Sequence, residues 1–293
     1  MCLDSLKKQI QIDLETGFIP LLVSANFGAT GMCAVDDIVG INEIAKEHKI
    51  WLNIDAAYAG VVSMLPEMRP LTAQLNLADS MFINGSKWMN CLLNSSLLFF
   101  RDRAAVAASL NATGVYLDNK QTSSGVVVDL KDYQVGLGAP FRSLKFFTVF
   151  QSFGVVGLRG TLRRHISLAK YLHQCLDLHS MDFSTTHGTS AAPFIFPIEP
   201  IFGLVCAAFN PAAYPKHKYA DFLKFIDLVN ATDKIYIVHT VLTPPVGDAA
   251  AAEQGDLFLV RFSLSHATLD FADMDRIVNI VFEQLVEFNK IGC

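Results

Sequence analysis

The segments WLNIDAAYAG at residues 51–60 and NGSKW at residues 84–88 decide the fold that we expect for this chain. Each segment joins an apolar run of strand type to a turn of small residues. Asp55 comes directly after the first predicted strand, and Lys87 follows the second. Because open α/β sheets bind ligands at the carboxyl ends of their strands, the two side chains predict a site at that edge.

A carboxylate and a lysine at neighbouring strand ends suit pyridoxal phosphate. A lysine amine forms a Schiff base with this cofactor, and Lys87 fits that role. The pyridine nitrogen needs an acidic partner to stay protonated, and Asp55 fits that second role. The small residues Ala56, Ala57 and Gly60 are expected to let a flat ring lie against the backbone, with Ala57 supporting one face. The spacing alone leaves an alternative, a turn aspartate and a solvated lysine.

The segments NIDAAYAG and NGSKW resemble the two signature segments of the group II pyridoxal-phosphate decarboxylases, most of all the aromatic L-amino acid decarboxylases. The resemblance runs over nearly the whole chain. It implies an α/β large domain of pyridoxal-phosphate fold type I, like that of aspartate aminotransferase, present in part at residues 1–145. A connecting helix and a small α+β carboxyl-terminal domain would follow at residues 146–293. It also implies a homodimer in the cytoplasm.

The resemblance assigns three further residues to the cofactor. Thr30 matches the threonine that contacts the ring hydroxyl, although a turn threonine often bonds nearby backbone instead. Asn84 and Ser86 match residues near the phosphate. Family members usually carry histidine at the position of Ser86 and also at that of Asn53. These two departures leave cofactor binding plausible and put activity in question.

Residues 104–133 form a polar stretch that resembles the mobile catalytic loop of the family. Tyr116 matches the tyrosine that returns a proton to the substrate carbon after carbon dioxide leaves; the alternative is a tyrosine that anchors a surface loop. Related aldehyde synthases can have phenylalanine there, so Tyr116 favours simple decarboxylation. Gly138 matches a glycine that leaves room for a large aromatic substrate, where histidine decarboxylases carry serine. An ordinary turn glycine is the alternative.

The function implied by the resemblance is pyridoxal-phosphate-dependent decarboxylation of aromatic L-amino acids, such as DOPA, 5-hydroxytryptophan, tyrosine or tryptophan, to amines and carbon dioxide. Family members have a further amino-terminal region with a serine-rich phosphate-binding turn and a histidine that faces Ala57 across the ring. Without that region we expect a fragment that is inactive alone, or a shortened homologue that serves as a dimerisation partner. Histidine decarboxylation and aromatic aldehyde synthesis remain alternatives.

Composition limits the other classes of function. The 293 residues are 52% apolar, with a net charge of −5 and no charge blocks, which argues against nucleic acid as a partner. No apolar run reaches membrane-spanning length, and the start has no signal-peptide pattern. Six scattered cysteines indicate free thiols in a reducing compartment, and no ligand-spaced cluster predicts a metal. We expect His165, His173 and His179 to be surface residues of a helix.

The apolar pattern predicts alternating strands and helices in the first half, which is typical of a doubly wound α/β domain, and strands with helices grouped on one side in the second half. Asp36 is expected to cap the second helix, and the first strand to be buried on both faces. The expected strands cover residues 19–24, 50–54, 78–83, 96–100, 203–209, 234–240 and 257–264. The expected helices cover residues 6–15, 36–49, 144–178, 219–230 and 271–289.

Overall fold

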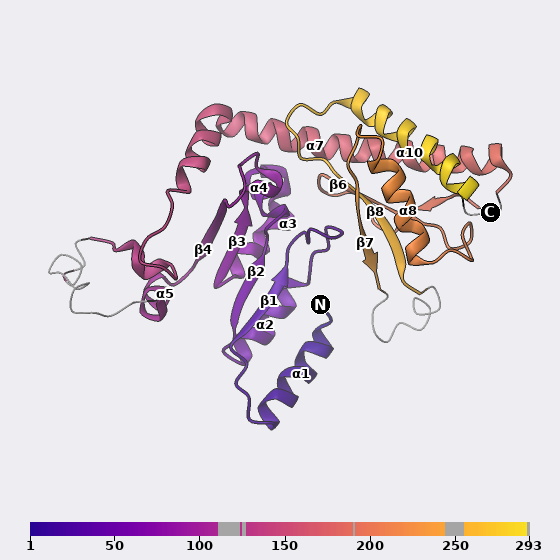
Figure 1. The fold of residues 1–293 in the computed structure, drawn as a ribbon. Coiled ribbons are helices and arrows are strands. Elements are labelled where there is room, and N and C mark those ends of the chain that lie inside the picture. The colour runs from indigo at the N-terminus through magenta and orange to yellow at the C-terminus, as the bar shows by residue number, and fades with distance from the viewer. Residues whose placement is uncertain (111–123, 125–126, 190, 244–254, 292–293) are drawn as a thin grey trace. The chain divides into compact units, whose positions relative to one another are not determined.

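The chain forms two compact units in the computed structural model (Figure 1). The first unit comprises residues 1–29 and 35–155, and the second comprises residues 30–34 and 156–293. The structure describes residues 1–110, 124, 127–189, 191–243 and 255–291. No helix among these residues is both long and apolar enough to span a membrane.

The first unit is built on a four-stranded sheet with the strand order β1-β2-β3-β4. Strands β1, β2 and β3 run parallel to one another, and β4 is antiparallel to β3. The regular elements of this unit are α1 (Leu3–Glu15), β1 (Leu22–Asn26), α2 (Ile38–Glu47), β2 (Trp51–Asp55), η1 (Ala59–Met64), η2 (Pro66–Met68), α3 (Arg69–Thr72), η3 (Ala73–Leu77), β3 (Ser80–Asn84), α4 (Gly85–Trp88), β4 (Ser96–Phe100), α5 (Arg103–Leu110), η4 (Leu130–Tyr133) and the start of α7 (Ser143–His187).

Helix α2 makes the crossover between the parallel strands β1 and β2. Its apolar side chains recur at helical spacing, so that Ile38, Ile41 and Ile44 lie on one buried face. The cap is Asp37, whose carboxylate accepts a hydrogen bond from the Gly40 backbone N–H at 3.0 Å. The prediction that Asp36 caps this helix was wrong, because the Asp36 carboxylate accepts from the backbone N–H of Asn26 at 2.7 Å.

Strand β1 begins later than the sequence predicted and is buried on one face only. Pro20 has no N–H to donate to a ladder, and pairing with β2 begins at Leu22 opposite Trp51. Val23 and Ala25 are buried, whereas the alternate side chains of β1 are exposed. The expectation of burial on both faces was therefore wrong for the described residues.

The stretch that was expected to be one long loop, residues 104–133, contains regular structure at both ends. Helix α5 occupies Arg103–Leu110, and its first turn is capped by Asp102, which accepts from the Ala105 backbone N–H at 3.0 Å. The turn η4 lies at Leu130–Tyr133. Small alanines with good helix propensity account for α5, which polarity alone did not reveal.

The second unit is an antiparallel sheet with the strand order β5-β6-β8-β7, with helices in the same unit. Its core includes an aromatic cluster around Phe209, in which Phe194, Phe225 and Phe288 have ring centroids 5.0–5.8 Å from that ring. The elements are the later part of α7, β5 (Phe194–Ile195), β6 (Leu204–Phe209), α8 (Tyr219–Asn230), β7 (Val238–Leu242), β8 (Leu257–Ser263) and α10 (Phe271–Ile291).

The sequence predicted that this strand starts at residue 234, but strand β7 starts at Val238. The Asn230 side chain explains the shift. Its amide donates to the Ile237 carbonyl at 3.0 Å, and its oxygen accepts from the Ile237 backbone N–H at 2.8 Å. Both backbone groups of Ile237 are thus bonded to a side chain at the end of α8, and the ladder begins one residue later.

Helix α7 runs further than the predicted 144–178 and is interrupted at Gly154. Gly154 has φ 59° and ψ 177°, a conformation that favours glycine because a Cβ would be strained there. The two compact units divide next to this kink, between Val155 and Val156. The helical pattern of the sequence gave no sign of the break, since the apolar residues continue across it.

Candidate functional site

Asp55 ends β2 and is oriented by the turn that follows it. Its Oδ1 accepts a hydrogen bond from the Ala57 backbone N–H at 3.0 Å. Its own carbonyl accepts from the Phe27 N–H at 2.8 Å, which ties it to the segment after β1. The second carboxylate oxygen makes no hydrogen bond to any described residue. Asp55 is therefore a fixed, partly buried carboxylate with one acceptor oxygen available for a ligand.

The turn from β3 into α4 carries Lys87 and is organised by Asn84. The Asn84 Oδ1 accepts from the Ser86 backbone N–H at 3.0 Å and from the Ser86 hydroxyl at 2.7 Å. This N-cap starts the short helix α4, in which Lys87 is partly buried. The Gly85 N–H donates to the Ser95 carbonyl at 2.8 Å, so the turn is also tied to the start of β4.

Two contacts join the Asp55 turn to the Lys87 turn. The Asn84 backbone N–H donates to the Ala57 carbonyl at 2.9 Å. The rings of Tyr58 and Trp88 stack with centroids 5.0 Å apart and planes at 14°. Because Asp55 bonds to Ala57 and Asn84 bonds to Ser86, one chain of hydrogen bonds links all four residues at this edge of the sheet.

The glycines of the two signature segments are required by packing. A Cβ at Gly60 would lie 2.7 Å from Ile83 and 2.8 Å from the Ala56 Cβ. A Cβ at Gly85 would lie 2.6 Å from the ring of Phe146. Packing alone therefore accounts for Gly60, which we expected from the sequence to make room for a flat ring. Ala57 is only 3% exposed.

A row of polar side chains crosses the sheet two residues before Asp55, at Asn53. The Asn53 amide donates to the Ser24 hydroxyl at 2.9 Å, and the Ser80 hydroxyl donates to the Asn53 oxygen at 2.8 Å. The Trp51 indole donates to the same Ser80 oxygen at 2.8 Å. Ser24 and Ser80 could not be identified from the sequence, because only the strand register shows that they flank Asn53.

Residues 1–196 match the family described as "Pyridoxal-dependent decarboxylase conserved domain". The chain belongs to this family. It is 32% identical over 277 residues to a tyrosine decarboxylase of Papaver somniferum, covering 91% of this chain and 49% of that protein. It is also 34% identical to a phenylacetaldehyde synthase of Arabidopsis thaliana over 82% of this chain and 47% of that protein.

The fold agrees with solved structures of the same family. The crystal structure of Catharanthus roseus tryptophan decarboxylase in complex with L-tryptophan aligns with a TM-score of 0.78 and 26% identity, covering 98% of this chain and 55% of that chain. The Oryza sativa TDC structure with PLP and tryptamine aligns with a TM-score of 0.80 at the same identity and coverage. The chain thus spans about half the length of the relatives it matches.

The residues at this edge of the sheet fit pyridoxal phosphate. The available oxygen of Asp55 suits an N–H donor such as a protonated pyridine nitrogen, and Lys87 supplies the amine that the family's cofactor requires. The Asn84 oxygen is occupied by Ser86, but the amide N–H groups of Asn84 can donate to a phosphate.

Three further residues were expected at the site. Thr30 is exposed and belongs to the second unit, where its carbonyl accepts a hydrogen bond from the Arg261 guanidinium. Gly138 is exposed, with no atom within 4 Å of the place where a Cβ would stand. Tyr116 lies outside the described residues. The roles expected for these three residues stay predictions.

The histidine and cysteine side chains are mostly structural. His165 is buried and contacts the His266 carbonyl at 2.9 Å, so the prediction of a surface position was wrong for this residue. Burial raises the pKa of Cys33 to about 12 and that of Cys206 to about 11, which keeps both thiols protonated. The five described cysteines are free, and the described residues contain no metal-binding group of three His, Cys, Asp or Glu side chains.

Proposed function

We propose that this chain carries the lysine and aspartate of a pyridoxal-phosphate site that decarboxylates aromatic L-amino acids to amines and carbon dioxide. The observation that carries the proposal is the parallel register of β2 and β3, in which Asp55 pairs with Phe82. This register sets the Asp55 turn beside the turn that presents Lys87. The family match and the aromatic amino acid decarboxylases among its relatives support the choice of reaction.

Each residue has a distinct task in the proposed site. The cofactor, when bound, withdraws electrons from the substrate carbon that loses carbon dioxide. Lys87 Nζ would hold the cofactor covalently. Asp55 accepts the pyridine N–H and keeps that proton in place, while Ala57 supports one ring face. Asn84, through its amide N–H groups, and Ser86 lie near the phosphate.

The remaining residues would act from other parts of the chain. Thr30 contacts the ring hydroxyl, and Gly138 leaves space for the aromatic side chain of the substrate. Tyr116 returns a proton to the carbon after carbon dioxide leaves, and its loop excludes water. The family resemblance supports these three tasks, and each can be removed by a single substitution.

The test of the proposal is covalent mapping of the cofactor. Residues 1–293 are incubated with pyridoxal phosphate, reduced with borohydride, dialysed and digested. We expect the cofactor mass on the peptide that contains Lys87 and its loss in Lys87→Ala. Lys145→Ala is the matched control, since Lys145 lies in the same unit and donates to the Leu93 carbonyl. A Lys87→Ala protein that stays yellow after reduction and dialysis would show that another lysine holds the cofactor.

A second candidate reaction is aromatic aldehyde synthesis, which the match to a phenylacetaldehyde synthase supports. The two reactions are separated by their products. Amine formation from tyrosine, DOPA, tryptophan and 5-hydroxytryptophan supports decarboxylation, whereas phenylacetaldehyde from phenylalanine supports the second reaction. Tyr116 favours the amine, because a phenol at that position can return the proton.

We also propose that the chain associates with a second copy of itself. Large apolar side chains are exposed on the first unit, and Phe141, Leu144 and Phe147 gather at the start of α7 with 74%, 48% and 59% exposure. An apolar patch of this kind is typical of a subunit interface. Light scattering should show a dimer that Phe147→Asp weakens, while Lys145→Ala leaves it intact. A monomer at all concentrations would contradict the proposal.

A further inference from the structure

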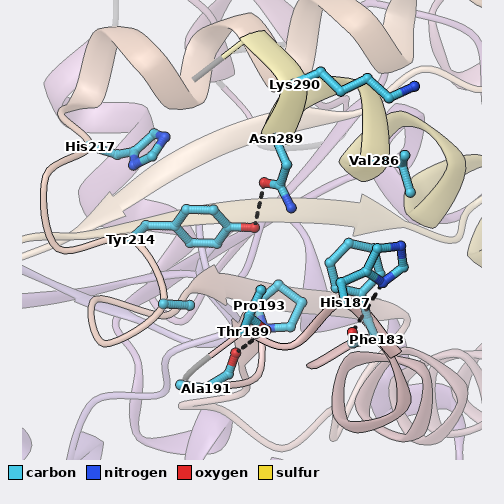
Figure 2. Close-up of a pocket in the computed structure, with 11 residues that line it drawn as sticks. Phe183, His187, Thr189, Ala191, Pro193, Tyr214, His217, Val286, Asn289 and Lys290 are labelled. Atoms are coloured by element: carbon cyan, nitrogen blue, oxygen red, sulfur yellow. Dashed lines mark hydrogen bonds between the residues drawn. The ribbon is translucent and has the colours of Figure 1, made fainter. Parts of the chain in front are cut away.

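The second unit contains a pocket of about 500 Å³ to which the proposed reaction assigns no role. It lies between the end of α7, the last turns of α10 and the segment that follows β6 (Figure 2). The described residues that line it all belong to the second unit, whereas Asp55 and Lys87 belong to the first. Its volume is in the range of ordinary small-molecule sites.

The walls of the pocket are flat and apolar. The apolar residues of the lining include Phe183, Pro193, Tyr214 and Val286. The His187 ring stacks on Phe183 with centroids 4.0 Å apart and planes at 20°. Aromatic walls of this kind pack best against another flat ring, offset or edge on. The shape and surface therefore suit a ligand of one or two aromatic rings.

One polar pair is already satisfied within the pocket. The Tyr214 hydroxyl donates to the Asn289 Oδ1 at 3.2 Å, as the dashed line in Figure 2 shows. Burial raises the pKa of Tyr214 to about 12, so its phenol stays a protonated donor at neutral pH. The Asn289 oxygen is thus occupied by Tyr214.

Two imidazoles of the lining have ring nitrogens that can hydrogen-bond a ligand. The His187 Nδ1 lies 3.1 Å from the Phe183 carbonyl, which only accepts, so Nδ1 is the donor there and Nε2 is the ring nitrogen left for a ligand. The His217 Nδ1 is buried and has no hydrogen-bond partner among the described residues. A buried polar atom without a partner is uncommon and is often explained by a ligand or an ordered water.

Charge does not direct the choice of ligand. The described lining residues include no carboxylate. The Lys290 ammonium is bonded to Glu287 at 2.7 Å, so the cation at the rim is already neutralised. The pocket therefore suits an uncharged, flat apolar ligand that carries a hydrogen-bond donor, rather than an ion.

We propose that this pocket binds a small phenol- or indole-type aromatic, a flat ring whose O–H or N–H donates to an imidazole nitrogen of the pocket. The ring fills the space between Phe183, Pro193 and Val286, and His217 is the buried acceptor. The site stands apart from the proposed decarboxylation, and its occupation does not require pyridoxal phosphate.

The test is calorimetric titration of residues 1–293 with two matched pairs of ligands. One pair is 4-methylphenol and 4-methylanisole, and the other is indole and 1-methylindole; methylation removes the donor and keeps the ring. We expect saturable binding of 4-methylphenol and indole, with methylation weakening it by about tenfold or more, because a site built around a hydrogen bond rejects the analogue that lacks it.

Two variants locate the binding. Val286→Trp fills the pocket from a partly exposed position of α10. It should lower the affinity for 4-methylphenol and for indole by about tenfold or more. Glu283→Trp is its control, since Glu283 is exposed on the same helix and does not line the pocket. His217→Phe keeps the packing of that ring against Tyr214 and Phe288 and should lower affinity for 4-methylphenol to that for 4-methylanisole.

Several results would overturn the proposal. One is the absence of saturable binding, and another is equal affinity for the donor and its methylated analogue. A third is unchanged binding by Val286→Trp. If His217→Phe is folded by circular dichroism and still prefers 4-methylphenol, the assigned acceptor is wrong. Because binding is read without cofactor or turnover, failure here is distinct from failure of the decarboxylase proposal.

Discussion

The two sheets of this protein are buried in the opposite way from what their strand directions would suggest. Parallel strands are usually buried on both faces, and antiparallel strands often on one. Here the parallel strand β1 alternates between exposed and buried side chains, whereas every residue of the antiparallel strand β6 is buried. The first sheet therefore presents polar groups on one face, and strand β6 of the second sheet is buried along its whole length.

The difference follows from what packs on each sheet. In the first unit the partly exposed face carries Ser24, Asn53 and Ser80, which bond to one another across the strands. In the second unit Val205 and Phe209 join the aromatic core on one face of β6. On the other face, the Cys206 thiol lies 3.8 Å from the Gly31 carbonyl, because residues 30–34 pack there. We expect substitutions in the first sheet to affect chemistry and those in the second to affect stability.

The largest effect is expected at Asp55. In the proposed site, Asp55→Asn removes the charge that would keep the pyridine nitrogen protonated, and we expect amine formation to fall by roughly a thousandfold, about 4 kcal/mol of transition-state stabilisation. The Asn side chain can still accept from Ala57, so the turn and the thermal stability should change little. The measurement compares amine formation with cofactor attachment at Lys87. Near-normal decarboxylation by Asp55→Asn would exclude the role given to this carboxylate.

A substitution in the second core should act on stability instead. Phe225 is fully buried, with its ring 5.3 Å from Phe209 and 5.8 Å from Phe288. Phe225→Ala leaves a cavity and should lower the free energy of unfolding by about 3–5 kcal/mol. Tyr236→Ala is the control in the same unit, because Tyr236 is 82% exposed. Denaturant unfolding measures both, and equal losses would contradict the position of the core.

The sequence predicted the elements whose signals are local. Strand Ser96–Phe100 and helix Tyr219–Asn230 were predicted with the bounds that the structure shows. The helix has a clear apolar period, and Asp221 in its first turn bonds back to the Lys218 N–H at 3.0 Å. The fold class followed from the alternation of strands and helices together with the family resemblance.

The elements that the sequence did not predict depend on contacts distant in the chain or on very short segments. The kink at Gly154 interrupts an unbroken apolar pattern, and the start of β7 is set by the Asn230 side chain. Asp55 and Lys87 were identifiable because motifs mark them, and their roles remain predictions. Ser24 and Ser80 were not identifiable, since their link to Asn53 exists only through strand register.

A smaller effect is expected where the Lys87 turn packs on α7. Gly85→Ala would set a Cβ 2.6 Å from the ring of Phe146, and we expect a loss of about 1–3 kcal/mol in stability from overpacking. The double variant Gly85→Ala with Phe146→Leu should recover part of that loss, because the smaller side chain makes room. Gly138→Ala is the control, as nothing lies near its Cβ position. No recovery in the double variant would contradict this contact.

The smallest effect is expected from the protonation of His165 in the second unit. Burial is the main cause that lowers the pKa of His165 below its ordinary value of 6.5, and Arg164 acts in the same direction, whereas the bond to the His266 carbonyl opposes it. The folded state therefore binds this proton less readily than the unfolded state. The stabilising contribution is present above about pH 6.5 and is lost as the pH falls below that value toward the lowered pKa.

The measurement is the free energy of unfolding of the unchanged protein and of His165→Gln. It is made between about pH 7.5 and about pH 5, a range that brackets the ordinary histidine pKa. Glutamine keeps an N–H donor for the His266 carbonyl but does not titrate, so His165→Gln should lose less stability on acidification. The other histidines are common to both proteins, so their contribution cancels in the difference. Equal slopes for the two proteins would mean that His165 is protonated as readily when folded as when unfolded, and that its burial at the contact with His266 does not govern its charge.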